Sequence, residues 1–480
     1  MGRTVVGDEN QLEAQVDAII RSGKPAQVGL LVGKLGSAGS RDIVLALVPT
    51  PMNDDDVPPT LGVSASNEPS RKGADSMQVS AEWVGEHARQ VSRMLCGGMS
   101  VIGVYAFCTE GIYKSSQAIL WQAVMTVAAL GTPSLDGGDM SEYLLLHISS
   151  SPRRFSCRSC QKGSNFSATA LRPCEWKLGK LLNNLQEFSC TYNVDISYPV
   201  KIDGTEAANN KIRENLLAAI SYEAERLQTA RAVVDGSLAE PEKLLGSGST
   251  VHTVDLLLPI DGGAQVQPSG GDTKIVGKVI YKGEVHARSY GIVREPISRA
   301  IAGLKEDIVA SLRSRLELLI DEAEQAAGDA QYENTDSMQE VTADSLLMSH
   351  LSSDIPEQSL VMPRRVFVPW VDGAMISDYM LPDENLQDVQ EHLTDLFGVE
   401  KKLDPSEIIE PETAGIVSMK VVTPSEVRNK DTSQSVAASS KVAEPMRPLS
   451  PARSTAPLTY IGAALVLVIA MLLSMFFLSR

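Results

Sequence analysis

Apolar side chains recur at every third or fourth position in several stretches of this chain, a spacing typical of helices that bury one face. In the clearest stretch, Ser80 is a candidate N-cap, and Gly97 and Gly98 follow the last apolar position, Leu95. This pattern predicts a helix over 80–95. The same spacing predicts further helices over 113–130, 206–232, 294–326 and 384–398.

Short apolar runs bounded by glycine, proline and polar residues predict buried strands. The runs 26–34 and 42–49 are separated by a short segment containing Gly and Ser, which predicts a hairpin. Further strands are predicted over 99–107, 143–149, 252–259, 274–290, 364–370 and 374–381. Because strands and helices alternate along the first part of the chain, we expect an α/β or α+β fold.

The length of the chain predicts more than one globular unit. Its 480 residues, 43% of them apolar, exceed what one ordinary core accommodates. We expect a first α/β domain over 1–200, with a mobile polar insert at 51–79, and a second α+β domain over 201–399. Residues 400–456 are rich in Ser, Pro, Val, Glu and Lys without a period, which predicts a flexible, disordered linker.

The last apolar segment, 457–478, predicts a transmembrane anchor. From Leu458 to Leu478 no side chain is charged, and these 21 residues would form a helix of about 31 Å, the thickness of a bilayer's hydrocarbon core. A buried core helix is the alternative, but such helices usually break their apolar run within roughly 10–14 residues. Only Ser479 and Arg480 follow, so we expect a single-pass, tail-anchored protein whose N-terminal body faces the cytosol. The single trailing Arg favours the endoplasmic reticulum membrane over the mitochondrion.

The charge of the chain narrows the class of its partners. A net charge of −17 argues against nucleic acid, whose phosphates select basic surfaces. It also argues against a body that adheres to anionic lipid by charge. Proteins are therefore the expected partners.

The cysteines would remain thiols in a reducing cytosol, so we expect no disulfides. The spacing of Cys157, Cys160, Cys174 and Cys190 invites a zinc interpretation. A structural zinc site, however, normally has a close pair of ligands at both ends, and here the second pair is scattered. We therefore expect ordinary buried cysteines, with no metal and no cofactor.

The predicted strand over 99–107 contains Gly103 and Tyr105 and follows a helix and a glycine turn. This order resembles the core of MPN domains, the deubiquitinase-like folds of the proteasome lid. In the active members of that family the strand runs Gly-x-Tyr-His-x-His, followed by a Ser and an Asp, and these side chains hold a zinc ion that activates water.

The MPN ligand positions are mostly lost in this chain. Ala106 and Cys108 stand at the two histidine positions, Ser116 at the serine position and Ile119 at the acid position. Because Ala and Ile have no metal-binding atoms, the resemblance implies an MPN-like domain that lacks its metal ligands. Glu86 and His87 could supply an alternative acid and ligand, but they lie on a predicted helix whose surface is ordinarily charged.

No other motif points to catalysis. The chain contains no GxSxG, P-loop, GxGxxG after a strand or HExxH sequence. The remaining histidines lie on unrelated predicted elements: His147, His252, His286, His350 and His392. We assign no catalytic, cofactor-binding or metal-binding residue and expect no enzymatic activity. The alternative is a cysteine-dependent hydrolase or isopeptidase using Cys108 or the Cys157/Cys160 pair, which would need a nearby histidine to lower the thiol pKa.

A distributed set of short segments resembles the Odr-four-like family, the tail-anchored proteins of the odorant-response-abnormal class. Their order along the chain, more than any one of them, carries the resemblance. The segments are Met1–Thr4, Gly29–Gly33, Glu86–Ala88, Gln90–Leu95, Gly97–Gly98, Gly103–Val104, Cys157–Arg158, Trp176, Arg365–Pro369, Asp378–Tyr379 and Asp383–Glu384.

This resemblance implies an adaptor. Members of the family are implicated in the folding and trafficking of multi-pass receptors from the endoplasmic reticulum, and in animals they pair with the ubiquitin-fold-modifier-specific protease and hold it at that membrane. The implied partners are therefore that protease, multi-pass membrane proteins and the bilayer, the last through 457–478. A membrane tethering factor is a further alternative, although such factors usually carry heptads next to the anchor and none appear in 401–456.

Overall fold

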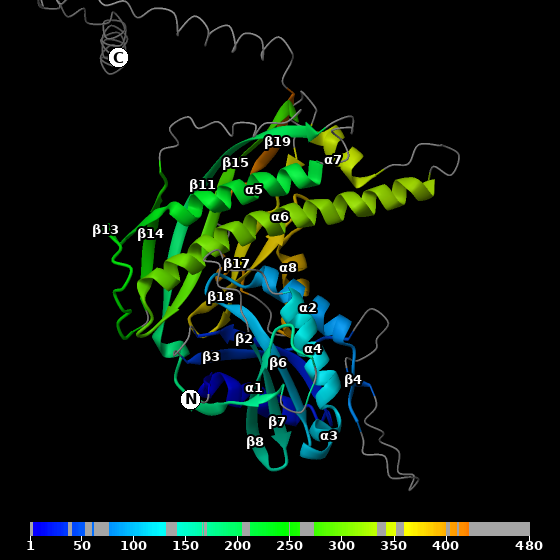
Figure 1. Ribbon diagram of the computed structural model, residues 1–480, viewed down its shortest axis with the longest axis vertical. Helices are drawn as coiled ribbons and strands as arrows, with labels where there is room; N and C mark the ends of the chain where they lie inside the picture. The colour runs from blue at the N-terminus through cyan, green and yellow to red at the C-terminus, as the bar shows by residue number, and fades with distance from the viewer. Residues whose placement is uncertain are drawn as a thin grey trace, which may run out of the picture. The chain divides into compact units, whose positions relative to one another are not determined.

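The mixed α+β composition expected from the sequence is present in the computed structural model (Figure 1). All described residues belong to one unit, Met1–Val422. The structure describes residues 3–421 apart from 37–40, 53–59, 62–75, 131–141, 166, 168–169, 204–211, 249, 260–272, 334–341, 352–359, 400–403 and 410–411.

The N-terminal part of the unit is built on a mixed sheet of eight strands in the order β10-β1-β3-β2-β6-β7-β8-β9. The strands are β1 (Thr4–Asp8), β2 (Gln27–Lys34), β3 (Asp42–Pro49), β6 (Ser100–Cys108), β7 (Glu142–Ser150), β8 (Arg153–Gln161), β9 (Arg172–Pro173) and β10 (Glu175–Gly179). β2 runs antiparallel to β3 and β6, whereas β6 and β7 are parallel. A short pair, β4 (Thr60–Leu61) and β5 (Gln78–Val79), accompanies this sheet.

The strands β2, β3, β6 and β7 of the first sheet are buried on both faces, which explains why they appear in the sequence as continuous apolar runs. Successive residues of β2, such as Leu30 and Leu31, point to opposite faces and belong to different core clusters. The helices α2 (Ala81–Met94) and α4 (Gln117–Leu130) pack on the Leu30 face, and α1 (Glu9–Arg21) packs on the Leu31 face.

Local sequence signals set several helix ends. Ser80 caps α2 as predicted, by accepting a hydrogen bond from the Trp83 N–H. The helix predicted over 113–130 is two helices, α3 (Glu110–Ser115) and α4. They are separated at the buried Ser116, whose Oγ accepts a hydrogen bond from the Met77 N–H over 2.7 Å.

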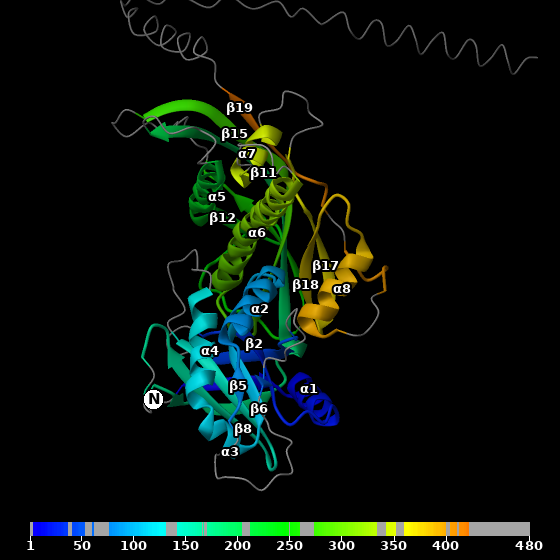
Figure 2. The ribbon, with the colours of Figure 1, turned by 90° about the vertical axis from the view of Figure 1, so that its right-hand side faces the viewer.

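A second sheet has the strand order β13-β12-β14-β11-β15-β19-β16. Its strands are β11 (Leu185–Asp203), β12 (Arg231–Val234), β13 (Ser237–Leu238), β14 (Val251–Leu257), β15 (Thr273–Ile292), β16 (Leu360–Val361) and β19 (Ile416–Val421). Figures 1 and 2 show the helices α5 (Ile212–Thr229) and α6 (Ile297–Glu333) side by side on one face of this sheet, and α7 (Ala343–Leu351) near the end of α6.

The hairpin of β17 (Arg364–Val371) and β18 (Ala374–Met380) returns to the N-terminal part of the unit. Its apolar residues, with those of α8 (Leu386–Phe397), belong to the core cluster that contains α2 and α4. A β-bridge joins Leu95 to Ile376, and the Phe397 ring meets Trp370 edge-on at 5.2 Å. Figure 2 shows the hairpin and α8 on the side of β11 and β15 opposite to α5 and α6.

The boundaries of these substructures differ from the sequence expectation. β11 crosses residue 200, so the second sheet begins at Leu185. Residues 364–397 complete the first core although they lie, in sequence, between β16 and β19 of the second sheet. An apolar pattern shows that a residue is buried but does not show against which partner.

The predicted linker over 400–456 is wrong for one segment, because Ile416–Val421 forms β19 and pairs with β15. Strand pairing of this kind needs only a free edge and a few alternating residues, and it leaves little compositional signal. Among the helices of the described residues, none has both the length and the apolarity to cross a membrane, and the segment 457–478 lies outside those residues.

Candidate functional site

The MPN ligand positions identified in the sequence lie at the end of β6 and in the following helices. Ala106 and Cys108 are fully buried, and the β6–β7 register places Ala106 opposite His147. Ser116 is committed to the Met77 backbone, and Ile119 packs against the core from α4. These four side chains therefore serve packing and a backbone hydrogen bond.

The structure brings a histidine beside Cys108, which the sequence did not indicate, because β6 and β7 are parallel neighbours. The His147 Nε2 lies 3.1 Å from the Cys108 carbonyl oxygen, and the ring stacks on Tyr113 with centroids 4.1 Å apart. The Nδ1 lies 3.9 Å from a Glu110 carboxylate oxygen.

This arrangement does not favour a cysteine nucleophile. Burial, with the nearby Glu110 carboxylate, raises the pKa of Cys108 to about 12, so the thiol stays protonated at neutral pH. Burial also lowers the pKa of His147, and its Nε2 faces a backbone carbonyl. The Cys108 alternative therefore lacks the activated thiolate that nucleophilic catalysis requires.

The Cys157 and Cys160 side chains of the CRSC sequence point to opposite faces of β8. Cys157 belongs to the core cluster beneath α1, Cys160 to the cluster beneath α2 and α4, and Cys190 to the core of the second sheet. Residues three positions apart on a strand point to opposite faces. A CxxC sequence can therefore bring two metal ligands together in a turn but not in a strand. Within the described part of the chain, no three His, Cys, Asp or Glu side chains form a group that could hold a metal ion.

Glu86 and His87 have separate structural roles on α2. Glu86 forms a surface ion pair with Arg89. His87 is 1% exposed, and its Nε2–H donates to the Leu396 carbonyl at the end of α8 over 2.8 Å, while Nδ1 faces the Thr50 hydroxyl. Burial lowers the pKa of His87 to about 4, so the ring is neutral at pH 7 and ties α2 to α8.

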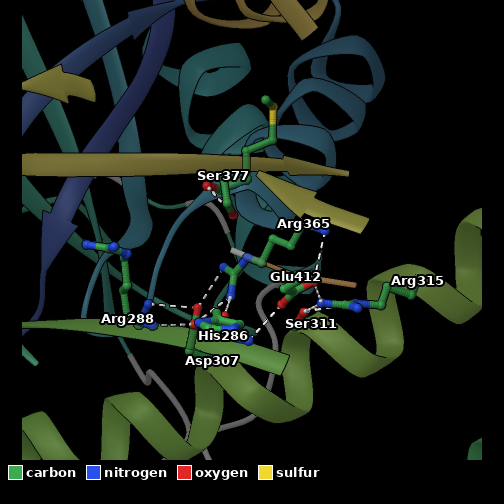
Figure 3. Close-up of polar contacts among 10 residues, drawn as sticks. His286, Arg288, Asp307, Ser311, Arg315, Arg365, Ser377 and Glu412 are labelled. Atoms are coloured by element: carbon green, nitrogen blue, oxygen red, sulfur yellow. Dashed lines mark hydrogen bonds and ion pairs between the residues drawn. The ribbon is translucent and has the colours of Figure 1, made fainter. Parts of the chain in front are cut away.

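Among the described residues, a cluster of buried charges lies where β15, α6 and β17 meet (Figure 3). Asp307 on α6 binds both terminal nitrogens of Arg365 on β17 over 2.7 and 2.9 Å. The same carboxylate accepts hydrogen bonds from the backbone N–H groups of Gly97 and Arg288 over 3.0 and 2.9 Å. One carboxylate therefore joins α6 and β17 to β15 and to the turn after α2.

A second buried carboxylate, Glu412, continues this network (Figure 3). It lies 2.5 Å from Arg315, which is fully buried and also contacts the Ser311 hydroxyl. It also accepts the backbone N–H groups of Arg365 and His286 over 2.9 and 2.7 Å. The network fixes the chain at residue 412 just before β19.

Burying charged side chains costs free energy unless each charge has a partner. Here each carboxylate has an arginine and at least two backbone donors. We therefore assign the network to holding the first core, the second sheet and the β17–β18 hairpin together. The sequence signal that could have found it is the polar stripe Asp307, Ser311 and Arg315, spaced by four beside the apolar stripe of the long helix.

Comparison with known proteins identifies the family. A model of the family described as "Odorant response abnormal 4-like" matches residues 29–408, well over half of the chain. The chain belongs to the odorant response abnormal 4-like family. The matched range runs from β2 through α8 and contains Asp307 and Arg365, two residues of the buried network.

Relatives of this odorant response abnormal 4-like protein have similar lengths and low identity. "Protein odr-4 homolog" of Mus musculus is 23% identical over 458 residues, covering 90% of this chain and 92% of its own. The Homo sapiens homolog is 24% identical, with 90% and 91% covered, and that of Dictyostelium discoideum is 22% identical, with 78% and 75% covered.

Similarity to solved structures is low. The crystal structure of UfSP from C. elegans has a TM-score of 0.37 and 9% identity, and the match covers 82% of this chain and 56% of that one. The solution structure of protein DSY2949 from Desulfitobacterium hafniense has a TM-score of 0.19 and 15% identity, covering 37% of this chain and 94% of that one. At these TM-scores neither likeness carries an argument.

Proposed function

We propose that this family member is a non-catalytic, membrane-anchored adaptor at the endoplasmic reticulum. In this proposal it recruits a ubiquitin-fold-modifier-specific protease, assists the folding and trafficking of multi-pass membrane receptors, or does both. The observation that carries the proposal is the family match over residues 29–408, together with relatives of similar length.

The chemistry of the described residues supports the non-catalytic part of the proposal. At the end of β6, the position where an MPN enzyme would hold zinc, Ala106 and Cys108 are fully buried in the core. Cys108 is protonated at neutral pH, and the buried charges of Asp307 and Glu412 are fully engaged with arginines and backbone donors. These groups stabilise the fold and leave no activated nucleophile at the places where the sequence suggested one.

The membrane part of the proposal rests on the uncharged segment from Leu458 to Leu478. It is tested by deleting 457–480 and separating membranes from cytosol. We expect full-length protein in the membrane fraction and the shortened protein in the cytosol. Sedimentation of the shortened protein with membranes would contradict the anchor.

The choice of membrane needs its own control. Replacing 458–478 with an unrelated apolar helix of the same length keeps insertion while changing the sequence of the span. If the endoplasmic reticulum is selected by length and flanking charge, both proteins co-fractionate with markers of that membrane. Relocation of the replaced protein would show that specific residues of the span select the organelle.

The adaptor part is tested by purifying the tagged full-length protein from detergent-solubilised membranes and identifying its partners by mass spectrometry. Stoichiometric recovery of a modifier-specific protease is the expected result. Recovery of multi-pass clients and chaperones without a protease would instead support a trafficking role outside the modifier pathway. Recovery of neither class would overturn the proposal.

A further inference from the structure

Cys157 and Cys174 lie directly opposite each other on neighbouring antiparallel segments. The β8–β9 register pairs Arg158 with Pro173, so the next pair is Cys157 and Cys174. The Cys174 N–H donates to the Cys157 carbonyl oxygen over 3.0 Å. Opposed residues joined in this way have Cα atoms about 5.5 Å apart and side chains on the same face, and disulfides span roughly 4.4–6.8 Å.

The two thiols differ in exposure and already interact. Cys157 is 3% exposed, whereas Cys174, just before β10, is half-buried. A hydrogen bond from the Cys157 thiol lowers the pKa of Cys174, against the opposing effect of partial burial. A hydrogen bond with Ser159 and the positive charge of Arg3 lower this pKa further. The same hydrogen bond and burial raise the pKa of Cys157.

The other cysteines lack this combination. Burial raises the pKa of Cys96, Cys108, Cys160 and Cys190 to about 12 in each case. A redox-active cysteine needs thiolate character, access to the oxidant and a second thiol beside it. Of the six cysteines, only Cys174 is partly exposed, and it faces Cys157.

We propose that Cys174 is a peroxide-reactive cysteine and that Cys157 resolves its oxidised form, giving a reversible disulfide between β8 and the segment entering β10. This modification site is independent of the adaptor role proposed above. The oxidant is a hydroperoxide, and the reductant that restores the site is a thiol.

The reaction balances in two steps. The Cys174 thiolate attacks one peroxide oxygen, the O–O bond breaks, and the departing hydroxide takes up a proton as water, leaving Cys174 as a sulfenic acid. The Cys157 sulfur then attacks the Cys174 sulfur, the S–S bond forms, the S–O bond breaks, and the hydroxide leaves with the Cys157 proton as a second water. Two thiols and one hydrogen peroxide thus give one disulfide and two waters.

Oxidation would add a covalent bond where the two ends of the first sheet already meet, because Cys174 is the single residue between β9 and β10. β10 pairs with β1 at one edge of the first sheet, and β8 lies near the other edge with β9. Exposed disulfides are among the readily reduced ones, and Cys174 is partly exposed. The bond would fix Cys174, the residue that links β9 to β10, to β8 until a thiol reduces it.

The sequence allows each cysteine to be followed separately. Trypsin cleavage after Arg154, Arg158, Lys162 and Lys177 places Cys157, Cys160 and Cys174 in the peptides 155–158, 159–162 and 163–177. The reduced full-length protein in detergent is treated with hydrogen peroxide, blocked with N-ethylmaleimide, digested and analysed by mass spectrometry. A parallel sample contains dimedone, which traps sulfenic acids.

We expect the linked pair 155–158 and 163–177, lighter than its two reduced peptides by two hydrogen atoms and absent after dithiothreitol. In Cys157→Ser, Cys174 should instead accumulate as the dimedone adduct, and in Cys174→Ser, Cys157 should remain reduced. The matched control Cys160→Ser, three residues along the same strand, should give the same linked pair as the unmodified sequence.

Three results would overturn the proposal. The first is that Cys174 of the unmodified protein stays reduced, as the buried cysteines do, at the same peroxide concentrations. The second is a linked pair containing 159–162, which would make Cys160 the resolving residue. The third is a sulfenic acid at Cys174 that persists although Cys157 is present.

Discussion

Asp307 and Arg365 are 58 positions apart in the sequence and form a bidentate ion pair in which both side chains are 1% exposed. Asp307 comes from the long helix of the second sheet, and Arg365 from the hairpin that completes the first core. Because the backbone of Gly97 also donates to this carboxylate, the pair fixes three distant segments relative to one another.

Replacing Asp307 with Asn should destabilise the fold strongly. The substitution keeps the shape of the side chain but leaves the Arg365 charge buried without a counter-ion, which typically costs about 3–5 kcal/mol. Urea unfolding of the full-length protein in detergent measures this loss. Asp321→Asn on the same helix, where the carboxylate is 50% exposed and lies 3.5 Å from Arg93, should cost less than about 1 kcal/mol.

Replacing Glu412 with Gln should release the segment that leads into β19. The amide oxygen can accept only one of the two backbone hydrogen bonds, because His286 and Arg365 donate to different carboxylate oxygens. In addition, Arg315, 0% exposed, loses its counter-ion. Limited trypsin digestion should then cleave after Lys420 at least about tenfold faster, which corresponds to roughly 1.4 kcal/mol of easier local opening. Glu407→Gln, at an exposed side chain nearby, is the control and should digest like the unmodified protein.

Stability should fall as the pH drops from 7 to 5, and His87 should account for much of the fall. Its pKa is about 4 in the folded protein and 6.5 ordinarily, so the unfolded chain binds the proton first as the pH falls through 6.5. The linkage gives a loss of roughly 2 kcal/mol between pH 7 and pH 5, complete only below the folded pKa.

The variant His87→Gln isolates this contribution, because its amide can still donate to the Leu396 carbonyl but does not titrate. Between pH 7 and pH 5, the free energy of unfolding of this variant should fall by roughly 2 kcal/mol less than that of the unmodified protein. Parallel pH profiles for the two proteins would show that other groups carry the acid sensitivity.

Replacing Gly103 with Ala should disrupt the pairing of β6 with β7. A methyl group there would overlap the Leu144 carbonyl oxygen and its neighbouring backbone atoms, which cannot rotate away. Overpacking of this kind costs about 1–3 kcal/mol or more. The matched control is Gly111→Ala on α3, where no heavy atom lies within 4 Å of the added carbon, and thermal unfolding should show no loss of stability there.

Much of the secondary structure could be predicted from the sequence because it depends on local spacing. The predicted strand over 42–49 coincides with β3, and the predicted helix over 80–95 with its Ser80 cap becomes α2 within one residue at each end. The single helix predicted over 113–130 missed the break at Ser116, because the Met77 backbone that binds this hydroxyl lies 39 residues away.

The chemistry at the candidate sites depended on which residues meet in space. The sequence identified Cys108 but found no histidine near it, whereas His147 lies on the adjacent parallel strand. It paired Cys157 with Cys160 by spacing, whereas the strand turns them to opposite faces and Cys174 becomes the neighbour of Cys157.

The sequence by itself determined the alternation of helices and strands, the absence of metal-binding atoms at Ala106 and Ile119, and the uncharged run from Leu458 to Leu478. These features follow from the identity and spacing of residues that are close along the chain. Only the tertiary structure decided that Asp307 binds Arg365 and that Glu412 binds Arg315, because a charge in the sequence does not reveal whether it will be buried. In the packed structure each of these buried charges lies beside its partner, because burying an unpaired charge would cost more free energy than the fold could offset.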